Sequence, residues 1–273
     1  MLAGAPNMKQ IISKLQLYHI LLASLAFRII LFFFYADVTL VDEWANLVNN
    51  FESTGVIGFR VALDEFNAVP KSAITGERVL PSVFMPPLYF FFIYLIKIIF
   101  EDFLNYINLI IFAQIFLSIV SILFFYKIIS YFENKNFSLL MTTFFGLFPI
   151  YVYSSVQISS ISLQIFLLIF FLYFLQKLMQ NFNFYYLIFF SIVSGLMILI
   201  RAEFLFFYPL TIFYLFIFFK PNLKAIVISL IITILTISPY LARNLQTFDK
   251  IIITKSLGYN LLKGNNPTFK VEG

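Results

Sequence analysis

Asp42 and Glu43 are adjacent acidic residues that follow the first long apolar stretch of a chain in which only 11% of residues are charged. A carboxylate in such a place can act as a general base on an acceptor hydroxyl, or a pair can bind a cation beside an anionic substrate. The spacing alone does not choose between these uses. The structural alternative is helix capping, because Thr39 followed by Asp42 fits a capping box and first-turn acids favour the helix dipole.

Two further polar groups follow later apolar stretches. Arg201 and Glu203 come directly after the stretch 185–200, and Arg243 and Asn244 follow the last stretch. Two guanidinium groups at one membrane face can bind a phosphate through bidentate hydrogen bonds. The alternatives are interfacial anchoring and a simple charge balance between Arg201 and Glu203.

The elements that must position these residues are membrane helices. Hydrophobic residues make up 62% of the chain, which predicts an all-α polytopic membrane protein because a backbone inside a bilayer must be helical. The apolar stretches predict about seven crossings, at residues 17–35, 106–126, 139–153, 163–175, 185–200, 204–219 and 225–240. The first stretch is too long for a signal-peptide core and contains Arg28, which should face the bundle interior and have a partner.

A long first outer loop, residues 36–105, should have structure of its own. An apolar stripe at helical spacing predicts a surface helix, formed by Val41, Trp44, Leu47, Val48 and Phe51. The short apolar run 88–100 begins after two prolines and contains Lys97, which favours an interfacial or re-entrant helix.

The lysines predict the orientation. With the N-terminus in the cytoplasm, the inner segments hold seven lysines and only one acidic residue, Glu133, as the positive-inside rule expects: Lys9, Lys14, Lys127, Lys135, Lys177, Lys220 and Lys224. Residues 1–240 then form the transmembrane core and 241–273 an extracytoplasmic segment. The net charge of +5 is explained by these loops and does not indicate nucleic-acid binding, and the lack of cysteine excludes thiol chemistry and thiolate metal sites.

Four sequence segments resemble motifs of one enzyme class. The tail PYLARNLQTF…SLGYNLLKGNNP is similar to the segment after the last core span of bacterial membrane glycosyltransferases of the GT-C class, such as protein mannosyltransferases and lipid A aminoarabinose transferases. In the same order, VDEWANL resembles their first-loop acidic motif, PPLYFF their Pro-Pro segment and RAEF their Arg-Pro-Glu-type motif. The resemblance covers essentially the whole chain.

This resemblance implies an inner-membrane transferase that moves a sugar from a polyprenyl-phosphate donor to an extracytoplasmic lipid, glycan or protein, with no resident cofactor. Asp42 matches the catalytic acidic position, with Glu43 beside it. Arg201 and Glu203 match the motif that lines the cavity, and Arg243 and Asn244 match the arginine-asparagine pair after the core. The carboxylate would accept the acceptor's proton while arginine stabilises the departing phosphate.

The sequence departs from the family pattern in two places, and these departures leave alternatives to a complete, metal-dependent transferase. The second outer loop, 154–162, contains no carboxylate, so the resemblance gives little support for a divalent cation. The chain is also shorter than its relatives, which fits a minimal core, a split enzyme whose partner chain supplies further spans, or an inactive fragment. A transporter or flippase of lipid-linked sugar is the rival from another class, because a buried arginine in a polar cavity would serve it equally well.

Overall fold

The computed structural model describes residues 16–40, 42–61, 78–101, 104–219, 222–255 and 265. Most of these residues are α-helical, and one antiparallel hairpin pairs Gly58 with Pro81 and Val61 with Arg78. The elements are α2 (Leu17–Tyr35), α3 (Asp42–Thr54), β1 (Gly58–Val61), β2 (Arg78–Pro81), α4 (Pro87–Phe100), α5 (Tyr106–Phe132), α6 (Lys135–Gly146), α7 (Pro149–Ser154), α8 (Ile161–Gln180), α9 (Phe184–Ile200), α10 (Phe204–Phe219) and α11 (Leu223–Phe248).

Four of the described helices are long and apolar enough to cross a membrane, namely α2, α5, α8 and α11. Three shorter apolar helices, α4, α9 and α10, accompany them. The chain is therefore an all-α protein with the helices of a multi-pass membrane protein. The predicted stretches 17–35 and 204–219 coincide with α2 and α10, and the prediction of helix over 88–100 is confirmed by α4.

The prediction of one continuous helix for the third crossing is wrong. Residues 139–153 divide between α6 and α7, and the break falls at Leu147 and Phe148. Pro149 explains the break, because proline has no amide hydrogen to donate and forces the preceding residue out of the helical region. Phe148 accordingly has an extended backbone, with φ −62° and ψ 120°.

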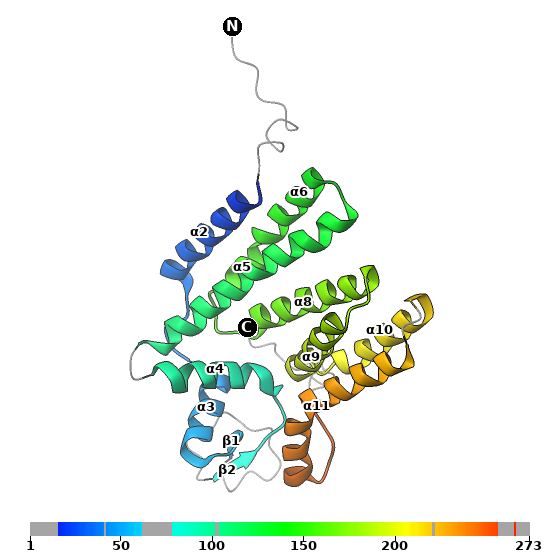
Figure 1. Ribbon diagram of the computed structural model, residues 1–273. Helices are drawn as coiled ribbons and strands as arrows, with labels where there is room; N and C mark the ends of the chain where they lie inside the picture. Colours follow the sequence, from blue (N-terminus) through cyan, green and yellow to red (C-terminus); the bar gives the residue numbers. More distant parts are fainter. Residues whose placement is uncertain are drawn as a thin grey trace.

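Helix α9 lies at the centre of the second half of the bundle, in contact with α8, α10, α11 and α4 (Figure 1). Small and hydroxylated side chains allow this packing, as is usual between membrane helices. Ser191 Oγ lies 2.7 Å from Ser229 Oγ of α11, and Tyr208 of α10 reaches the same hydroxyl at 2.8 Å. A side chain at Gly195 would meet Thr236 Cβ at 2.6 Å, so α9 and α11 approach closely there.

Helix α10 shows the opposite pattern, since only Tyr208 and Leu215 are buried along its length. Its large apolar side chains are exposed, among them Phe206, Leu210 and Phe213. Such a surface is costly in water and natural in contact with lipid chains. The exposure of α10 therefore agrees with a membrane environment.

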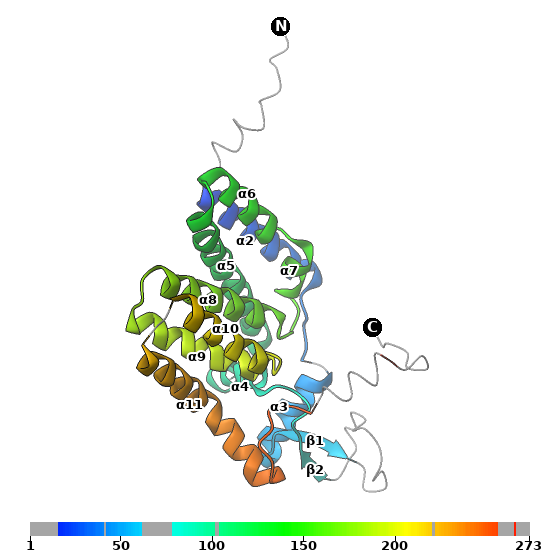
Figure 2. The same ribbon diagram turned by 90° about the vertical axis from the view of Figure 1, so that its right-hand side faces the viewer.

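One end of the bundle gathers the elements that the sequence predicts around the site. Helix α3, the hairpin and the C-terminal part of α11 lie together there, far from the end at which α5 connects to α6 (Figures 1 and 2). Helix α4 lies crosswise to α5 and packs against α3, α5 and α9. This end, together with the loop 155–160, is hereafter called the α3 end.

Candidate functional site

Helix α3 carries the acidic pair and is held on α4 by its apolar side. Leu47 and Val48 are buried, and the Trp44 ring meets Tyr89 edge-on with centroids 4.8 Å apart. Phe51 packs in the same way on Tyr94 at 4.9 Å. The predicted stripe is confirmed for Trp44, Leu47, Val48 and Phe51, whereas Val41 lies outside the described residues. Its aromatic members pack on the protein's own helix α4.

The acidic pair occupies the first turn of α3, because the helix begins at Asp42. The side chain of Glu43 is exposed, whereas the side chain of Asp42 lies outside the described residues. Leu40 is not helical and α3 begins at Asp42, so Thr39 does not directly precede the helix. The Asp42 side chain of the predicted capping box lies outside the described residues. Both acids remain where the positive end of the α3 dipole favours a negative charge.

A chain of hydrogen bonds lies under Trp44 and joins three elements. Tyr89 Oη donates to Gln114 Oε1 at 2.7 Å, and Gln114 Nε2 donates to the carbonyl of Gln157 at 2.7 Å. Gln157 Nε2 in turn donates to the carbonyl of Tyr35 at the end of α2. Burial, together with the nearby Asp37 carboxylate, raises the pKa of Tyr89, so its hydroxyl stays protonated as a donor.

Asp37 is a residue of the α3 end that the sequence analysis missed. Its Oδ2 accepts a hydrogen bond of 2.6 Å from the backbone amide of Ile158, and its own amide donates to the carbonyl of Val156 at 3.3 Å. The loop 155–160 has no carboxylate in its sequence, yet it is fastened by one from the exit of α2. The signal that could have found Asp37 is its position directly beyond the first apolar stretch.

Arg201 bonds the helix that follows the same loop. It ends α9 as the C-cap, and its Nε donates to Oε1 of Gln164 at 2.9 Å. Gln164 belongs to the first turn of α8, and its amide donates to the carbonyl of Ser160 at the end of the loop. Arg201 and Glu203 are both exposed, and no ion pair joins them in the part of the chain that the structure describes.

Arg243 and Asn244 lie elsewhere within the α3 end, at the junction of α11 with the hairpin. Arg243 Nη2 donates to the carbonyl of Ile57 at 2.8 Å, and Nη1 donates to the carbonyl of Ser82 at 3.2 Å. Asn244 is fully buried, and its Nδ2 donates to the carbonyl of Ile252 at 2.7 Å. Arg243 therefore fastens α11 to the residues next to the two strands, and Asn244 fastens the segment after α11 to that helix.

The structure thus divides the predicted site residues into two groups. Asp37, on the segment that leads into the acidic pair, bonds the loop 155–160, and Arg201 bonds the first turn of α8 directly after this loop. Arg243 and Asn244 instead bond the residues next to the strands and the segment after α11. Among the described residues, no three His, Asp or Glu side chains are grouped so that they could hold a metal ion.

Comparison with protein-family models, with curated proteins and with solved structures found no match. An acidic pair at a helix N-terminus and an exposed guanidinium near one loop can accept a proton and stabilise a developing negative charge. A general base and a cation that stabilises the leaving group are what group transfer from a phosphate requires.

Arg28 is buried within the bundle, as the sequence predicts for an ionised group inside a span. Its Nη1 donates to the carbonyls of Ser24 and Gly146, and its Nε donates to Ser118 Oγ at 3.0 Å. The carbonyl of Gly146 belongs to the last turn of α6, where the helix leaves acceptors unused and its dipole favours a cation. The partner of Arg28 is therefore the broken end of α6.

Proposed function

We propose that this chain is a GT-C class membrane glycosyltransferase that moves a sugar from a polyprenyl-phosphate donor to an extracytoplasmic acceptor. The observation that carries the proposal is the connection between the acidic helix and Arg201. Trp44, next to the acidic pair, packs on Tyr89, which is hydrogen-bonded through Gln114 to the loop 155–160. The same loop leads into Gln164, the partner of Arg201.

In this proposal the two sides of the loop have different roles. The carboxylate of Asp42 accepts the proton of an acceptor hydroxyl while that oxygen bonds to the anomeric carbon of the sugar. The bond from that carbon to the donor phosphate breaks, and the phosphate leaves with the electron pair. Arg201, oriented by Gln164, stabilises the phosphate charge, and Glu43 strengthens the negative field around Asp42.

Arg243 and Asn244 enter the proposal as positioning residues. The bonds of Arg243 to the carbonyls of Ile57 and Ser82 hold the hairpin on α11, and the bond of Asn244 to the carbonyl of Ile252 holds the segment after α11 on the same helix. These contacts close one side of the α3 end. Glu203, exposed two residues after Arg201, is assigned to the acceptor or sugar hydroxyls, for which a carboxylate is a good hydrogen-bond acceptor.

The proposed topology places the α3 end outside the inner membrane and the N-terminus in the cytoplasm, with seven crossings and α4 at the interface. The distribution of lysine supports this orientation. Lys127 and Lys135 flank the connection of α5 to α6, and Lys177 and Lys224 lie near the ends of α8 and α11 that are remote from α3. Further spans supplied by a partner chain remain part of the proposal.

The transporter alternative depended on Arg28 as a binding residue. The hydrogen bonds of Arg28 to two carbonyls and to Ser118 give it a structural role, so no described contact favours transport over transfer.

The test is sugar transfer in membranes that contain the full chain, with labelled polyprenyl-phosphate sugars as donors. Asp42→Asn should lower the transfer rate by about 100-fold or more, because a general base contributes on that order. Glu43→Gln is the matched control and should keep the rate within about tenfold of the wild type. Undiminished transfer by an Asp42→Asn protein that accumulates normally would show that Asp42 is not the general base. Absence of transfer from every donor would contradict the proposed transferase activity.

A further inference from the structure

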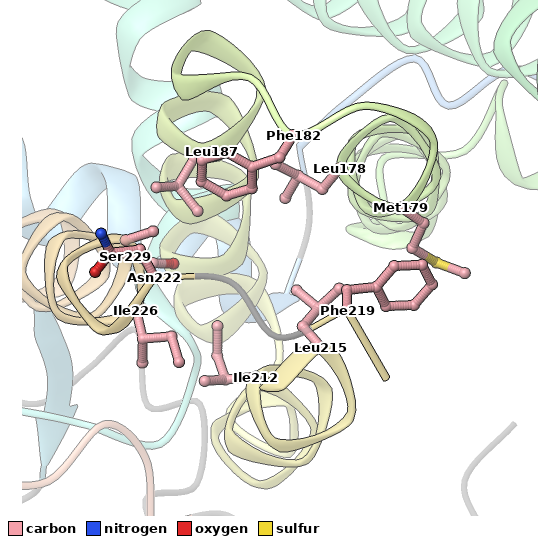
Figure 3. Close-up of a pocket in the computed structure, with 11 residues that line it drawn as sticks. Leu178, Met179, Phe182, Leu187, Ile212, Leu215, Phe219, Asn222, Ile226 and Ser229 are labelled. Carbon is pink, nitrogen blue, oxygen red and sulfur yellow. The ribbon is translucent and has the colours of Figure 1, made fainter. Parts of the chain in front are cut away.

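An apolar groove opens between the ends of four helices that are remote from α3. It measures about 400 Å³, and Figure 3 shows side chains of α8, α9, α10 and α11 arranged around its empty centre. Hydrocarbon side chains form almost all of its wall: Leu178, Met179, Phe182, Leu187, Ile212, Leu215, Phe219, Ala225 and Ile226, with Asn222 and Ser229 as the polar members. This region is hereafter called the groove end.

The two polar residues of the wall are already engaged within the protein. Asn222 caps α11, since its side-chain oxygen accepts from the amide of Lys224 at 3.0 Å. Ser229 Oγ is bonded to Ser191 at 2.7 Å and to Tyr208 at 2.8 Å. A polar ligand would find few partners in the groove, so its chemistry selects a hydrocarbon.

The size and position of the groove indicate what fills it. Its volume exceeds by more than ten times the roughly 30 Å³ that one water molecule occupies in the liquid, and an apolar wall does not hold a water cluster. Protein interiors are close-packed, so a space of this size at the surface of apolar helices is filled by its surroundings. Around membrane helices, those surroundings are lipid chains.

The charge at the groove end identifies the kind of lipid. Lys177 precedes Leu178 of the groove wall, and the exposed Lys224 precedes Ala225. The chain has no acidic residue between Glu133 and Glu203, nor between Glu203 and Asp249, so α8 to α11 contain no carboxylate that could balance these lysines. A lipid phosphate would supply the missing negative charge.

We propose that the groove binds one acyl chain of an anionic glycerophospholipid from the adjacent leaflet, and that Lys177 and Lys224 attract its phosphate. The bound chain fills the space between α10 and α11 and holds the two helices against α9. This site is separate from the donor site of the proposed transferase, whose phosphate is assigned to the α3 end. The lipid site stands even if the transferase proposal fails.

Native mass spectrometry of the full chain, purified in detergent with phosphatidylglycerol or phosphatidylcholine, tests the site. The wild type should retain one phosphatidylglycerol. Ala225→Trp fills the groove and should lose this lipid, as should Met179→Trp at the less buried rim, which guards against misfolding of the first variant. Leu235→Trp is the matched control, because Leu235 lies on the same helix as Ala225 and is 63% exposed outside the groove wall.

The lysines are tested by the preference for the anionic lipid. Each of Lys177→Gln and Lys224→Gln should reduce the preference for phosphatidylglycerol over phosphatidylcholine by about fivefold, as expected for one basic residue near an anionic headgroup. Retention of phosphatidylglycerol by both tryptophan variants would overturn the groove as the site. Equal retention of the two lipids by the wild type would show that the site does not select an anionic headgroup. Displacement of phosphatidylglycerol by polyprenyl phosphate at equal concentration would show that the site does not select a glycerophospholipid.

Discussion

The two ends of helix α9 have opposite surroundings. At its C-terminus, Arg201 is joined through Gln164 to a loop that hydrogen bonds connect to α2 and α5. At its N-terminus, about 25 Å away along a helix of this length, Leu187 faces the apolar groove. The α3 end is thus fixed by directional bonds within the protein, whereas the groove end has space that its surroundings must fill.

This difference indicates that a rigid site can form at the α3 end of the molecule. Hydrogen bonds between distant segments fix side chains in one geometry, which catalysis of group transfer requires. Contacts with hydrocarbon have no preferred direction and fix only distance and shape. Substitutions that remove one hydrogen-bond partner should therefore be more costly at the α3 end than elsewhere in the bundle.

Gln114→Leu should have the largest effect. It leaves the buried hydroxyl of Tyr89 without its acceptor and the carbonyl of Gln157 without its donor, and each unpaired buried group costs about 1–3 kcal/mol. We expect a loss of about 3 kcal/mol in the free energy of unfolding, measured by denaturation with sodium dodecyl sulfate in mixed micelles.

The matched control for this prediction is Gln176→Leu in α8. Gln176 is also buried, but its side chain makes one hydrogen bond, to the carbonyl of Ile128 at 3.1 Å. Loss of this hydrogen bond should lower the free energy of unfolding by about 1 kcal/mol. Equal costs for the two variants would contradict the view that the α3 end depends more strongly on its polar network.

The second prediction separates the two arginines of the α3 end. Arg243→Ala leaves two carbonyls of the hairpin region without their donor and should cost about 2 kcal/mol of unfolding free energy. Arg201→Ala removes an exposed side chain and should change this free energy by less than about 0.5 kcal/mol, while sugar transfer falls sharply. A stable Arg243→Ala protein, or an Arg201→Ala protein with undiminished transfer, would reverse the roles assigned here.

Local sequence signals predicted the helices well and the network poorly. The bounds of α2 and α10 follow from apolar composition, and the stripe from Trp44 to Phe51 follows from helical spacing. Tyr89 and Gln114, however, are 25 positions apart, and Asp37 and Ile158 are 121 positions apart. No local pattern encodes such pairs, because they form only when the helices pack.

The same limit explains Arg243. Its type and place at the end of a span agree equally with phosphate binding and with anchoring, and its carbonyl partners lie 161 and 186 positions away. The break between α6 and α7 was readable in principle, because Pro149 lies inside the stretch predicted as one helix. Hydrophobicity outweighed that signal in the prediction of the third crossing.

The third prediction concerns the ion pair that holds α3 on α4. Lys97 of α4 is nearly buried and donates to both carboxylate oxygens of Glu52 in α3, with Glu101 at 3.5 Å. Burial alone would lower the pKa of Lys97, but the hydrogen bonds and charges of Glu52 and Glu101 outweigh it and raise this pKa above its usual 10.5. The stability from this pair is therefore complete below about pH 10 and is lost as pH rises through the raised value.

Trp44 reports this change, because it is the chain's one tryptophan and it packs on Tyr89 between α3 and α4. Glu52→Gln keeps a hydrogen-bond acceptor and removes the charge, so it should cost about 1 kcal/mol and shift the alkaline transition of Trp44 fluorescence to lower pH. Glu133→Gln, an exposed change at the end of α5, is the control and should leave the transition in place. A transition that stays at the same pH in Glu52→Gln would show that α3 is held by its aromatic contacts alone, and the α3 end would then resemble the groove end more than its hydrogen bonds suggest.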